Sequence, residues 1–226
     1  KFSLIKTSSP RELNGFDYNI PGDISSGAFF IALTLLSKNS KLKLKNINLN
    51  PTRLGILTIL NKMGAMIKTK NIKTIKGEKC GDIIVKSNNK LKAINCPTSL
   101  NSSAIDEFLI IFLLAAKSKG VSYFKELSEL NKKESPRLKL GSKILNMIGI
   151  KTKLTDNTIK IYGNPNLRLD KKFEMKNYLK DHRIMAMCTI AALTLGGKWK
   201  IYDPNSINTS FPSFLKILRK SFGVKI

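Results

Sequence analysis

The chain has 226 residues, of which 42% are hydrophobic, and a formal net charge of +25 at pH 7. This length and apolar content can fill one large core or two small ones, which excludes a disordered chain. The longest apolar run, 108–116, is far shorter than the ~20 residues that cross a bilayer, so we expect no membrane partner. The lysines are spread along the chain and are not interleaved with aromatic residues, so we expect no nucleic-acid partner either.

The first third of the chain predicts short strands and then helices alternating with strands. Asp23, Ser25 and Ser26 are typical of a helix start, so we expect a buried helix over 23–36. A second helix is expected from Pro51 to Met63, ended by Gly64. The strands expected in this third are 2–5, 16–20, 41–47, 65–69 and 82–86.

The same order of elements recurs twice more along the chain. The helices expected there are 104–116, 138–148, 181–193 and 211–222. The strands expected there are 121–124, 151–154, 158–162, 198–202 and a last one from Val224. Glycine ends the second helix each time, at Gly64, Gly149 and Gly223. The chain is therefore predicted to contain three strand–helix–strand–helix–strand–strand units, at about 16–90, 91–163 and 164–226.

The first helix of each unit is apolar on nearly all sides, which places it in the centre with sheets outside. We predict an α/β fold, a pseudo-threefold inside-out α/β barrel of three βαβαββ units. Its parallel central helices would direct several N-termini toward one end. The partial positive charges of those N-termini favour an anion there.

A basic loop with one carboxylate precedes the helix expected at 138–148. It contains Lys132, Lys133, Glu134 and Arg137. Positive side chains beside a helix start suit a phosphate or carboxylate ligand. The alternative is a solvated loop in which Ser135 caps the helix and Pro136 occupies its first turn.

Charged residues also occupy the other helix starts. They are Asp23, Arg53, Asp106, Glu107, Asp181, His182 and Arg183. Asp106 and Asp181 can be simple helix caps, and His182 can be a structural histidine. Arg183 enters an apolar helix and needs an anionic partner, and Arg137 can likewise hold a carboxylate or phosphate bidentately. If these starts share one end, acids, bases and guanidinium groups meet in one cleft.

The cysteine pattern indicates neither a disulfide framework nor a metal site. Cys80, Cys96 and Cys188 are scattered and odd in number, which favours a reducing, cytoplasmic compartment. None has metal-ligand spacing, and His182 is the only histidine, so we expect no metal and no cofactor.

Five short motifs follow in a fixed order along the three units. They are Gly22-Asp23-Ile24-Ser25-Ser26, Ile105-Asp106-Glu107, Lys133-Glu134-Ser135-x-Arg137, Asp181-His182-Arg183 and Ser210-Phe211-Pro212. In this order and spacing the chain resembles 5-enolpyruvylshikimate-3-phosphate synthase (3-phosphoshikimate 1-carboxyvinyltransferase). The resemblance covers nearly the whole chain but only the C-terminal half of the family, whose two lobes enclose the active site. It implies that 1–15 is the tail of a missing first lobe and that 16–226 is the second lobe.

The resemblance also implies a cofactor-free reaction of the shikimate pathway, which leads to aromatic amino acids. The 5-hydroxyl of shikimate 3-phosphate attacks C2 of phosphoenolpyruvate while C3 is protonated, and phosphate then leaves. By motif match, Asp106 is the proton acceptor and Glu134 its proton-transfer partner. Asp106 and Lys133 would contact shikimate 3-phosphate. The residues implied to hold phosphoenolpyruvate are Arg137, Arg183 and His182.

Two positions depart from the family pattern. Pro136 stands where the family often has Asp, which affects local hydrogen bonds more than charge. Thr209 stands where one branch of the family has a phosphoenolpyruvate-binding lysine. The contact that this lysine makes is therefore absent or supplied by another residue.

Two alternatives stay open. One is the sister enolpyruvyl transferase that acts on UDP-N-acetylglucosamine, although the Lys-Glu-Ser-x-Arg and Asp-His-Arg motifs favour the shikimate enzyme. The other is a non-catalytic module that binds anions or nucleic acid, which would have no need of Asp106 and Glu134 among its cations. On the leading interpretation we expect this chain to be inactive without its first lobe, and the complete protein to be a monomer.

Overall fold

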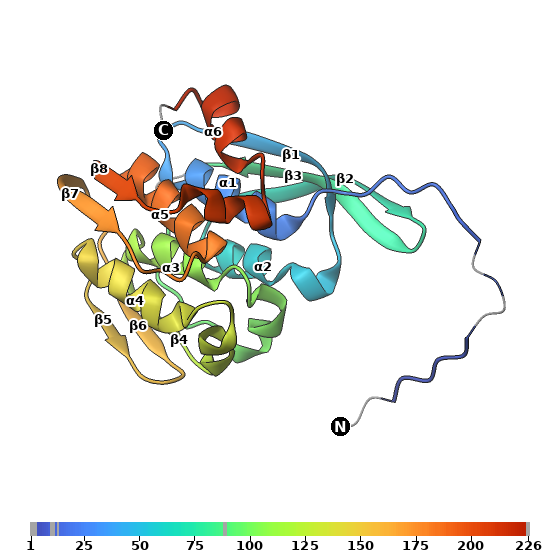
Figure 1. The fold of residues 1–226 in the computed structure, drawn as a ribbon, viewed down its shortest axis with the longest axis horizontal. Coiled ribbons are helices and arrows are strands. Elements are labelled where there is room, and N and C mark those ends of the chain that lie inside the picture. Colours follow the sequence, from blue (N-terminus) through green and yellow to red (C-terminus); the bar gives the residue numbers. More distant parts are fainter. Residues whose placement is uncertain (1–3, 10–11, 13, 88–89, 225–226) are drawn as a thin grey trace.

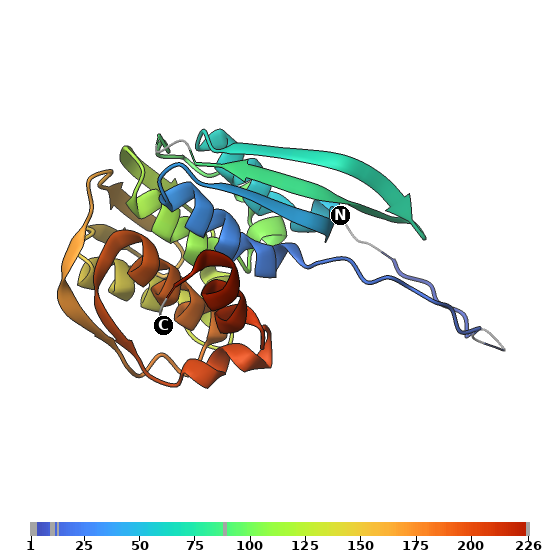
Figure 2. The same cartoon turned by 90° about the horizontal axis from the view of Figure 1, so that it is seen from above.

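The structure is a computed structural model that describes residues 4–9, 12, 14–87 and 90–224. Three helices form its centre: α1 (Ile24–Leu36), α3 (Phe108–Ala116) and α5 (His182–Leu195). They lie side by side (Figure 2) and contact one another pairwise. Every residue of α3 is buried, which is typical of a helix surrounded on all sides. The predicted α/β fold with its apolar helices inside is confirmed.

Three sheets lie outside these helices. The first has the order β1-β3-β2 and is antiparallel, formed by Lys41–Asn48, Glu78–Lys86 and Met66–Ile75. The second has the order β4-β6-β5 and is also antiparallel, formed by Gly120–Phe124, Ile159–Gly163 and Thr152–Leu154. The third pairs β7 (Leu169–Met175) with β8 (Gly196–Ile201) in parallel.

Parallel pairing recurs on either side of each central helix. β7 and β8 flank α5, while single parallel bridges do the same around α1 and α3, at Gly22–Ile47, Lys92–Lys119 and Asn95–Tyr123. A helix that connects two parallel strands must run opposite to both of them. Each central helix therefore begins where a parallel segment ends. All three central helices run antiparallel to the strand segments on either side of them.

The described residues also form further helices outside the centre. They are α2 (Gly55–Lys62), α4 (Arg137–Met147) and α6 (Phe214–Phe222), with the 3-10 helices η1 (Pro51–Arg53), η2 (Thr98–Leu100), η3 (Ser102–Ala104), η4 (Ser128–Lys132) and η5 (Pro204–Thr209). The glycines predicted to end the second helices have positive φ: +83° at Gly64, +84° at Gly149 and +63° at Gly223. These left-handed turns favour glycine because it has no Cβ.

Several predicted elements are wrong or differ in extent. No strand forms at 16–20; instead the ring of Phe16 lies 4.1 Å from Lys76 Nζ, which donates to the Asp17 carbonyl at 2.9 Å. The helix expected at 51–63 divides into η1 and α2, and the one expected at 104–116 begins at Phe108. β7 was not among the predicted strands. Four of its seven residues are charged, so its sequence lacks the apolar pattern that indicates a strand.

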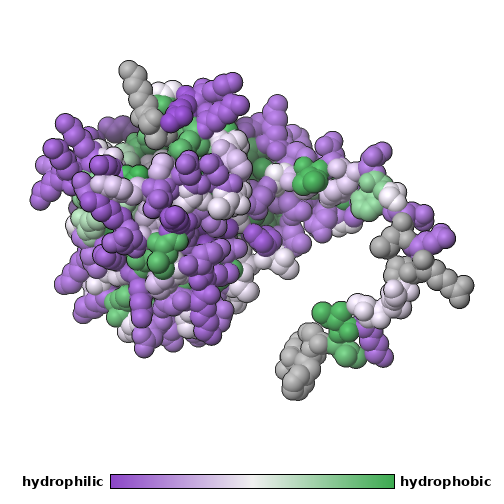
Figure 3. All heavy atoms as spheres, viewed as in Figure 1, coloured by the Kyte–Doolittle hydropathy of each residue, from purple (hydrophilic) through white to green (hydrophobic). Residues whose placement is uncertain are grey.

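The two ends of the chain lie partly outside the described residues. Of the strand expected at 2–5, residues 4 and 5 are in no strand, and neither is Val224. The N-terminal segment runs away from the body (Figure 1) and exposes Leu4 and Ile5. The rest of the visible surface is mostly hydrophilic (Figure 3). Among the described residues, no helix has the length and apolar character needed to span a membrane.

Candidate functional site

The starts of the three central helices meet at one end of the molecule. The Ser25 hydroxyl at the start of α1 donates to Glu107 Oε1 just before α3, at 2.5 Å. Arg183 in the first turn of α5 donates to the Asp106 carbonyl at 2.8 Å. The predicted convergence of helix N-termini is therefore confirmed, and it gathers charges from distant parts of the chain.

Asp106 is the central carboxylate of this cluster. Its Oδ1 lies 3.4 Å from Lys133 Nζ and 3.6 Å from Arg137 Nη1. Its Oδ2 lies 3.8 Å from Arg183 Nη2 and 4.0 Å from Arg53 Nη2. Burial alone would raise the pKa of Asp106, but the nearby positive charges outweigh it and lower the pKa below the usual 3.8. Asp106 is therefore ionised at neutral pH. It does not cap α3, because Glu107 occupies the cap position.

Arg137 is almost fully buried, with 1% of its side chain exposed. Its Nε donates to Asp181 Oδ2 at 2.9 Å and its Nη2 to Asp181 Oδ1 at 3.3 Å. The same Nη2 reaches Glu134 Oε2 at 2.6 Å. Although burial opposes ionisation of Asp181, the hydrogen bonds and charge of Arg137 lower its pKa. This buried pair fastens the basic loop to the start of α5.

Asp181 is both a helix cap and an ion-pair partner. It caps α5 by accepting from the Arg183 backbone N–H at 2.9 Å. It also accepts the Ser135 hydroxyl at 2.7 Å. Ser135 therefore does not cap α4, which corrects the solvated-loop alternative. Pro136 directly precedes the first residue of α4, where its missing N–H costs no helical bond.

A second carboxyl group lies beneath the cluster. Glu107 is 2% exposed, and its Oε1 is 3.9 Å from Arg183 Nη1. Burial raises the pKa of Glu107, although the Ser25 hydrogen bond and Arg183 oppose this. Ser25 Oγ in turn accepts from Arg53 Nη2 at 2.8 Å. The sequence placed these charged residues at helix starts but gave no sign that Ser25 would join two of them.

The remaining predicted site residues differ in exposure. The Glu134 side chain is 56% exposed, and His182 is half-buried in the first position of α5. Burial and the charge of Arg183 lower the pKa of His182, which makes it neutral at pH 7. In the part of the chain that is described, no group of three or more His, Cys, Asp or Glu could hold a metal.

The described cysteines are buried thiols without disulfide bonds. All three are free and buried: Cys80, Cys96 and Cys188. Burial raises the pKa of Cys188 to about 12 and that of Cys96 to about 11. These thiols are poor nucleophiles at neutral pH, because the thiolate is the reactive form.

The cluster has the parts that proton transfer on an anionic substrate needs. An ionised carboxylate, Asp106, can accept a hydrogen bond from a hydroxyl group. Lys133, Arg183 and Arg53 surround it with partly exposed donors, which can bind phosphate or carboxylate oxygens. Glu134 is accessible for a second proton transfer.

Known proteins are similar to this chain over most of its length. A 3-phosphoshikimate 1-carboxyvinyltransferase from Thermodesulfovibrio yellowstonii is 39% identical over 92% of this chain and 47% of its own length. One from Bacillus cytotoxicus is 37% identical over 90% of this chain and 47% of its own length. The chain thus spans about half the length of the curated relatives it matches.

Solved structures agree with the sequence matches. EPSP synthase from Acinetobacter baumannii aligns with a TM-score of 0.84 and 32% identity, over 89% of this chain and 46% of that one. The enolpyruvyl transferase NikO from Streptomyces tendae aligns with a TM-score of 0.65 at 15% identity, which indicates the same fold alone. The family model for EPSP synthase (3-phosphoshikimate 1-carboxyvinyltransferase) matches residues 3–218, and the chain belongs to this family.

Proposed function

We propose that this chain is the C-terminal lobe of a 3-phosphoshikimate 1-carboxyvinyltransferase. The observation that carries the proposal is the carboxylate of Asp106 held within 4.0 Å of four cations that come from three different parts of the chain. The proposed reaction joins the 5-hydroxyl of shikimate 3-phosphate to C2 of phosphoenolpyruvate and protonates C3. The tetrahedral intermediate then expels phosphate from C2 as C3 loses a proton, which restores the carbon–carbon double bond.

Asp106 accepts the proton of the shikimate hydroxyl in this proposal. Its lowered pKa keeps it ionised, so it is ready to act as a base or hydrogen-bond acceptor. Lys133, 30% exposed and 3.4 Å from Asp106, contacts shikimate 3-phosphate on the same side. The cation also stabilises charge that develops on the attacking oxygen.

Arg183, Arg137 and His182 hold phosphoenolpyruvate. Arg183 is the better placed of the two arginines. Its guanidinium makes a short hydrogen bond, from Nη1 to the Asp106 carbonyl at 2.8 Å, and its carboxylate partners lie at 3.8 and 3.9 Å, which leaves donors for a substrate. Arg137 offers an outward donor only when Glu134, 2.6 Å away, turns aside. Neutral His182 contributes one N–H donor without adding charge.

Glu134 transfers a second proton. Its exposed carboxylate can rotate away from Arg137 toward a bound substrate. Such a movement would couple phosphoenolpyruvate binding to proton transfer, because Arg137 gains a substrate oxygen as it loses Glu134. The two carboxylates Asp106 and Glu134 then share the proton transfers of addition and elimination.

The other lobe is the proposed partner of this chain. Because the matched relatives are about twice as long as the aligned region, we expect a facing lobe to supply further substrate contacts. The chain alone should bind ligands weakly and turn over none, and the two-lobed protein should act as a monomer. Buried free thiols fit a reducing compartment, and we propose the cytoplasm.

Calorimetric titration of the purified chain with phosphoenolpyruvate and shikimate 3-phosphate tests the proposal. Each ligand is titrated alone and with the other, at 50 and at 300 mM salt. We expect saturable binding that survives the higher salt. Arg183→Gln should weaken phosphoenolpyruvate about tenfold or more, since a hydrogen bond to a charged group is worth ~1.5–3 kcal/mol.

Lys139→Gln is the matched control, because it removes one positive charge from an exposed position on α4. It should change the affinity less than twofold. Equal losses in the two variants, or binding that disappears at the higher salt, would show that a general basic surface attracts the ligands. The assignment of a substrate half-site to this lobe would then be wrong.

A further inference from the structure

A second concave site lies at the opposite end of the central helices. It is a cavity of about 700 Å³ lined by the last residues of α1 and α5 and by the turn after α3. The 13 residues of α1 separate it from the charged cluster by about 20 Å, at ~1.5 Å per residue. It therefore belongs to a different site from the one assigned above.

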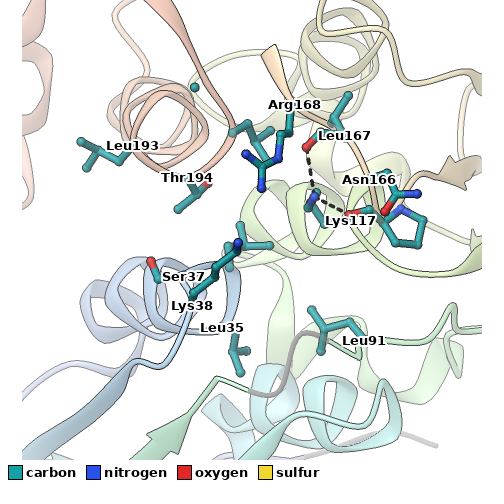
Figure 4. A pocket seen from close by; sticks show the side chains of 14 residues that line it. Leu35, Ser37, Lys38, Leu91, Lys117, Asn166, Leu167, Arg168, Leu193 and Thr194 are labelled. Atoms are coloured by element: carbon teal, nitrogen blue, oxygen red, sulfur yellow. Dashed lines mark hydrogen bonds between the residues drawn. The ribbon is translucent and has the colours of Figure 1, made fainter. Parts of the chain in front are cut away.

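Three basic side chains from separate segments point into this cavity. Figure 4 shows Lys38, Lys117 and Arg168 directed toward the same space, each following or preceding a different helix or strand. Among the described residues that line it, none is acidic. Within the described part of the chain, neither Lys38 nor Arg168 has a carboxylate partner.

Lys117 holds the segment that presents Arg168. Its ammonium donates to the carbonyls of Pro165 at 2.5 Å and Leu167 at 3.0 Å. Burial and the charge of Arg168 lower the pKa of Lys117, as expected for two cations that lie close together. An anion between them would relieve this repulsion.

These cations are not needed to complete the helix ends. Ser37 donates its backbone N–H and its hydroxyl to Leu33 O at the end of α1. At the end of α3, Ser118 donates to Ala115 O. The partial negative charge of a helix C-terminus is only about half an elementary charge, so three full positive charges exceed what the three helix ends supply.

We propose that this cavity binds a small organic oxyanion, a carboxylate or phosphate ester carried on an apolar body. Arg168 supplies a planar pair of donors for the anionic group, and Lys38 closes it from the other side. The part-exposed Leu36 and Leu193 line the cavity and provide contacts for the apolar part. Its volume is within the ~300–1,000 Å³ usual for small-molecule sites.

Titration calorimetry at constant ionic strength tests this proposal with three probes. Phenyl phosphate and benzoate carry the two candidate anionic groups on one ring, and benzyl alcohol carries the ring without charge. We expect saturable binding of at least one anion and none of the alcohol. The double variant Lys38→Gln/Arg168→Gln should weaken that anion at least tenfold, with an unchanged thermal unfolding midpoint.

Two further double variants show whether the binding depends on this cavity. Lys139→Gln/Lys143→Gln removes the same charge from the exposed face of α4 and should change the affinity less than twofold. Arg53→Gln/Lys133→Gln removes any binding of the probe at the cluster around Asp106, whereas the binding in the cavity should persist in that variant. The proposal would be wrong if either control lost the binding while Lys38→Gln/Arg168→Gln kept it. It would also be wrong if the unaltered chain showed no saturable binding. Neither result depends on whether the chain binds phosphoenolpyruvate.

Discussion

Arg137 shows how a side chain at the candidate site also supports the fold. Its partner Asp181 has no exposed side-chain surface, and the two share hydrogen bonds of 2.9 and 3.3 Å. A buried ion pair adds little compared with apolar packing, but the loss of one partner leaves a buried charge without compensation. The pair is therefore sensitive to substitution of either member.

Asp181→Asn should lower the free energy of unfolding by about 3 kcal/mol at pH 7, near the lower end for broken buried pairs. Because the folded-state pKa of Asp181 lies below its usual 3.8, the stabilisation is present above that pH and is lost as the pH falls through the folded value. Urea unfolding at pH 7 and pH 3 measures the loss of stability and its dependence on pH. Asp156→Asn, at an exposed position, is the control and should change stability by less than about 0.5 kcal/mol. A similar effect in both variants would contradict the buried pair.

Glu107 should show the opposite pH dependence. Because its folded-state pKa is raised above the usual 4.5, ionisation destabilises the fold as the pH rises above that value. Glu107→Gln keeps the shape and removes the ionisation. Its stability relative to the unaltered chain should therefore rise between pH 4.5 and pH 8, as measured by urea unfolding. Exposed Glu126→Gln should show no such trend, and a flat difference for Glu107→Gln would contradict the burial argument.

The individual site residues were predictable from the sequence to different degrees. Asp106, Lys133 and Arg183 stand at helix starts, and a repeat with parallel central helices is enough to bring them together. The Ser25–Glu107 hydrogen bond joins residues 82 positions apart, and no local pattern specifies which serine meets which carboxylate. Which roles the cluster plays with bound substrates stays a prediction.

At the scale of the elements, periodicity predicted helices better than strands at the edges. α1, α3 and α5 are apolar on all sides, so their burial follows from composition. A strand needs a partner, and 16–20 was predicted from the segment itself, without a pairing strand. Its backbone finds no ladder, whereas β7 forms because β8 lies beside it.

Close packing between α2 and η3 depends on one glycine. A Cβ at Gly55 would overlap Ser103 Oγ and lie 2.7 Å from the Ser103 carbonyl carbon. Gly55→Ala gains helix propensity of ~1 kcal/mol. Backbone atoms cannot move aside cheaply, so we expect the steric overlap to outweigh the gain in helix propensity. The free energy of unfolding of the variant should fall by ~1–3 kcal/mol, measured by urea unfolding.

Gly77→Ala separates steric contact from backbone strain. Gly77 has φ +84°, and a Cβ added there would meet no atom within 4 Å. Its substitution should cost only the ~1–2 kcal/mol of a left-handed residue. Adding Ser103→Gly removes the hydroxyl contact but leaves the backbone contacts, so it should restore part of the stability lost in Gly55→Ala and none of that lost in Gly77→Ala. Absence of that rescue would show that α2 and η3 are not in the described contact.

At the scale of the whole molecule, internal repetition predicted the architecture. Three apolar helices of similar position in their units can be buried together only if the sheets lie outside. The division of the chain at about 16, 91 and 164 stays a prediction. The shape of each sheet could not be read from the sequence, because its register depends on pairing between distant strands.

The net charge of +25 should make the free energy of unfolding increase with salt. Repulsion among like charges opposes the compact state, and raising sodium chloride from 0.05 to 0.5 M screens it. Exposed pairs such as Lys176–Glu174 would lose stability, but each is worth only ~0–1 kcal/mol. A net gain of about 1 kcal/mol corresponds to ~2–4 °C in the unfolding midpoint for a chain of this size.

Three exposed lysines on β2, Lys68, Lys70 and Lys73, provide the means to test the cause. Replacing all three by Gln removes repulsion from one strand without touching the buried cluster. The triple variant should be more stable than the unaltered chain at 0.05 M salt and should gain less when salt is added, as measured by thermal unfolding. A midpoint that falls with salt would show that exposed ion pairs outweigh repulsion. An equal gain in the variant would place the repulsion elsewhere on the surface, and β2 would then carry none of it.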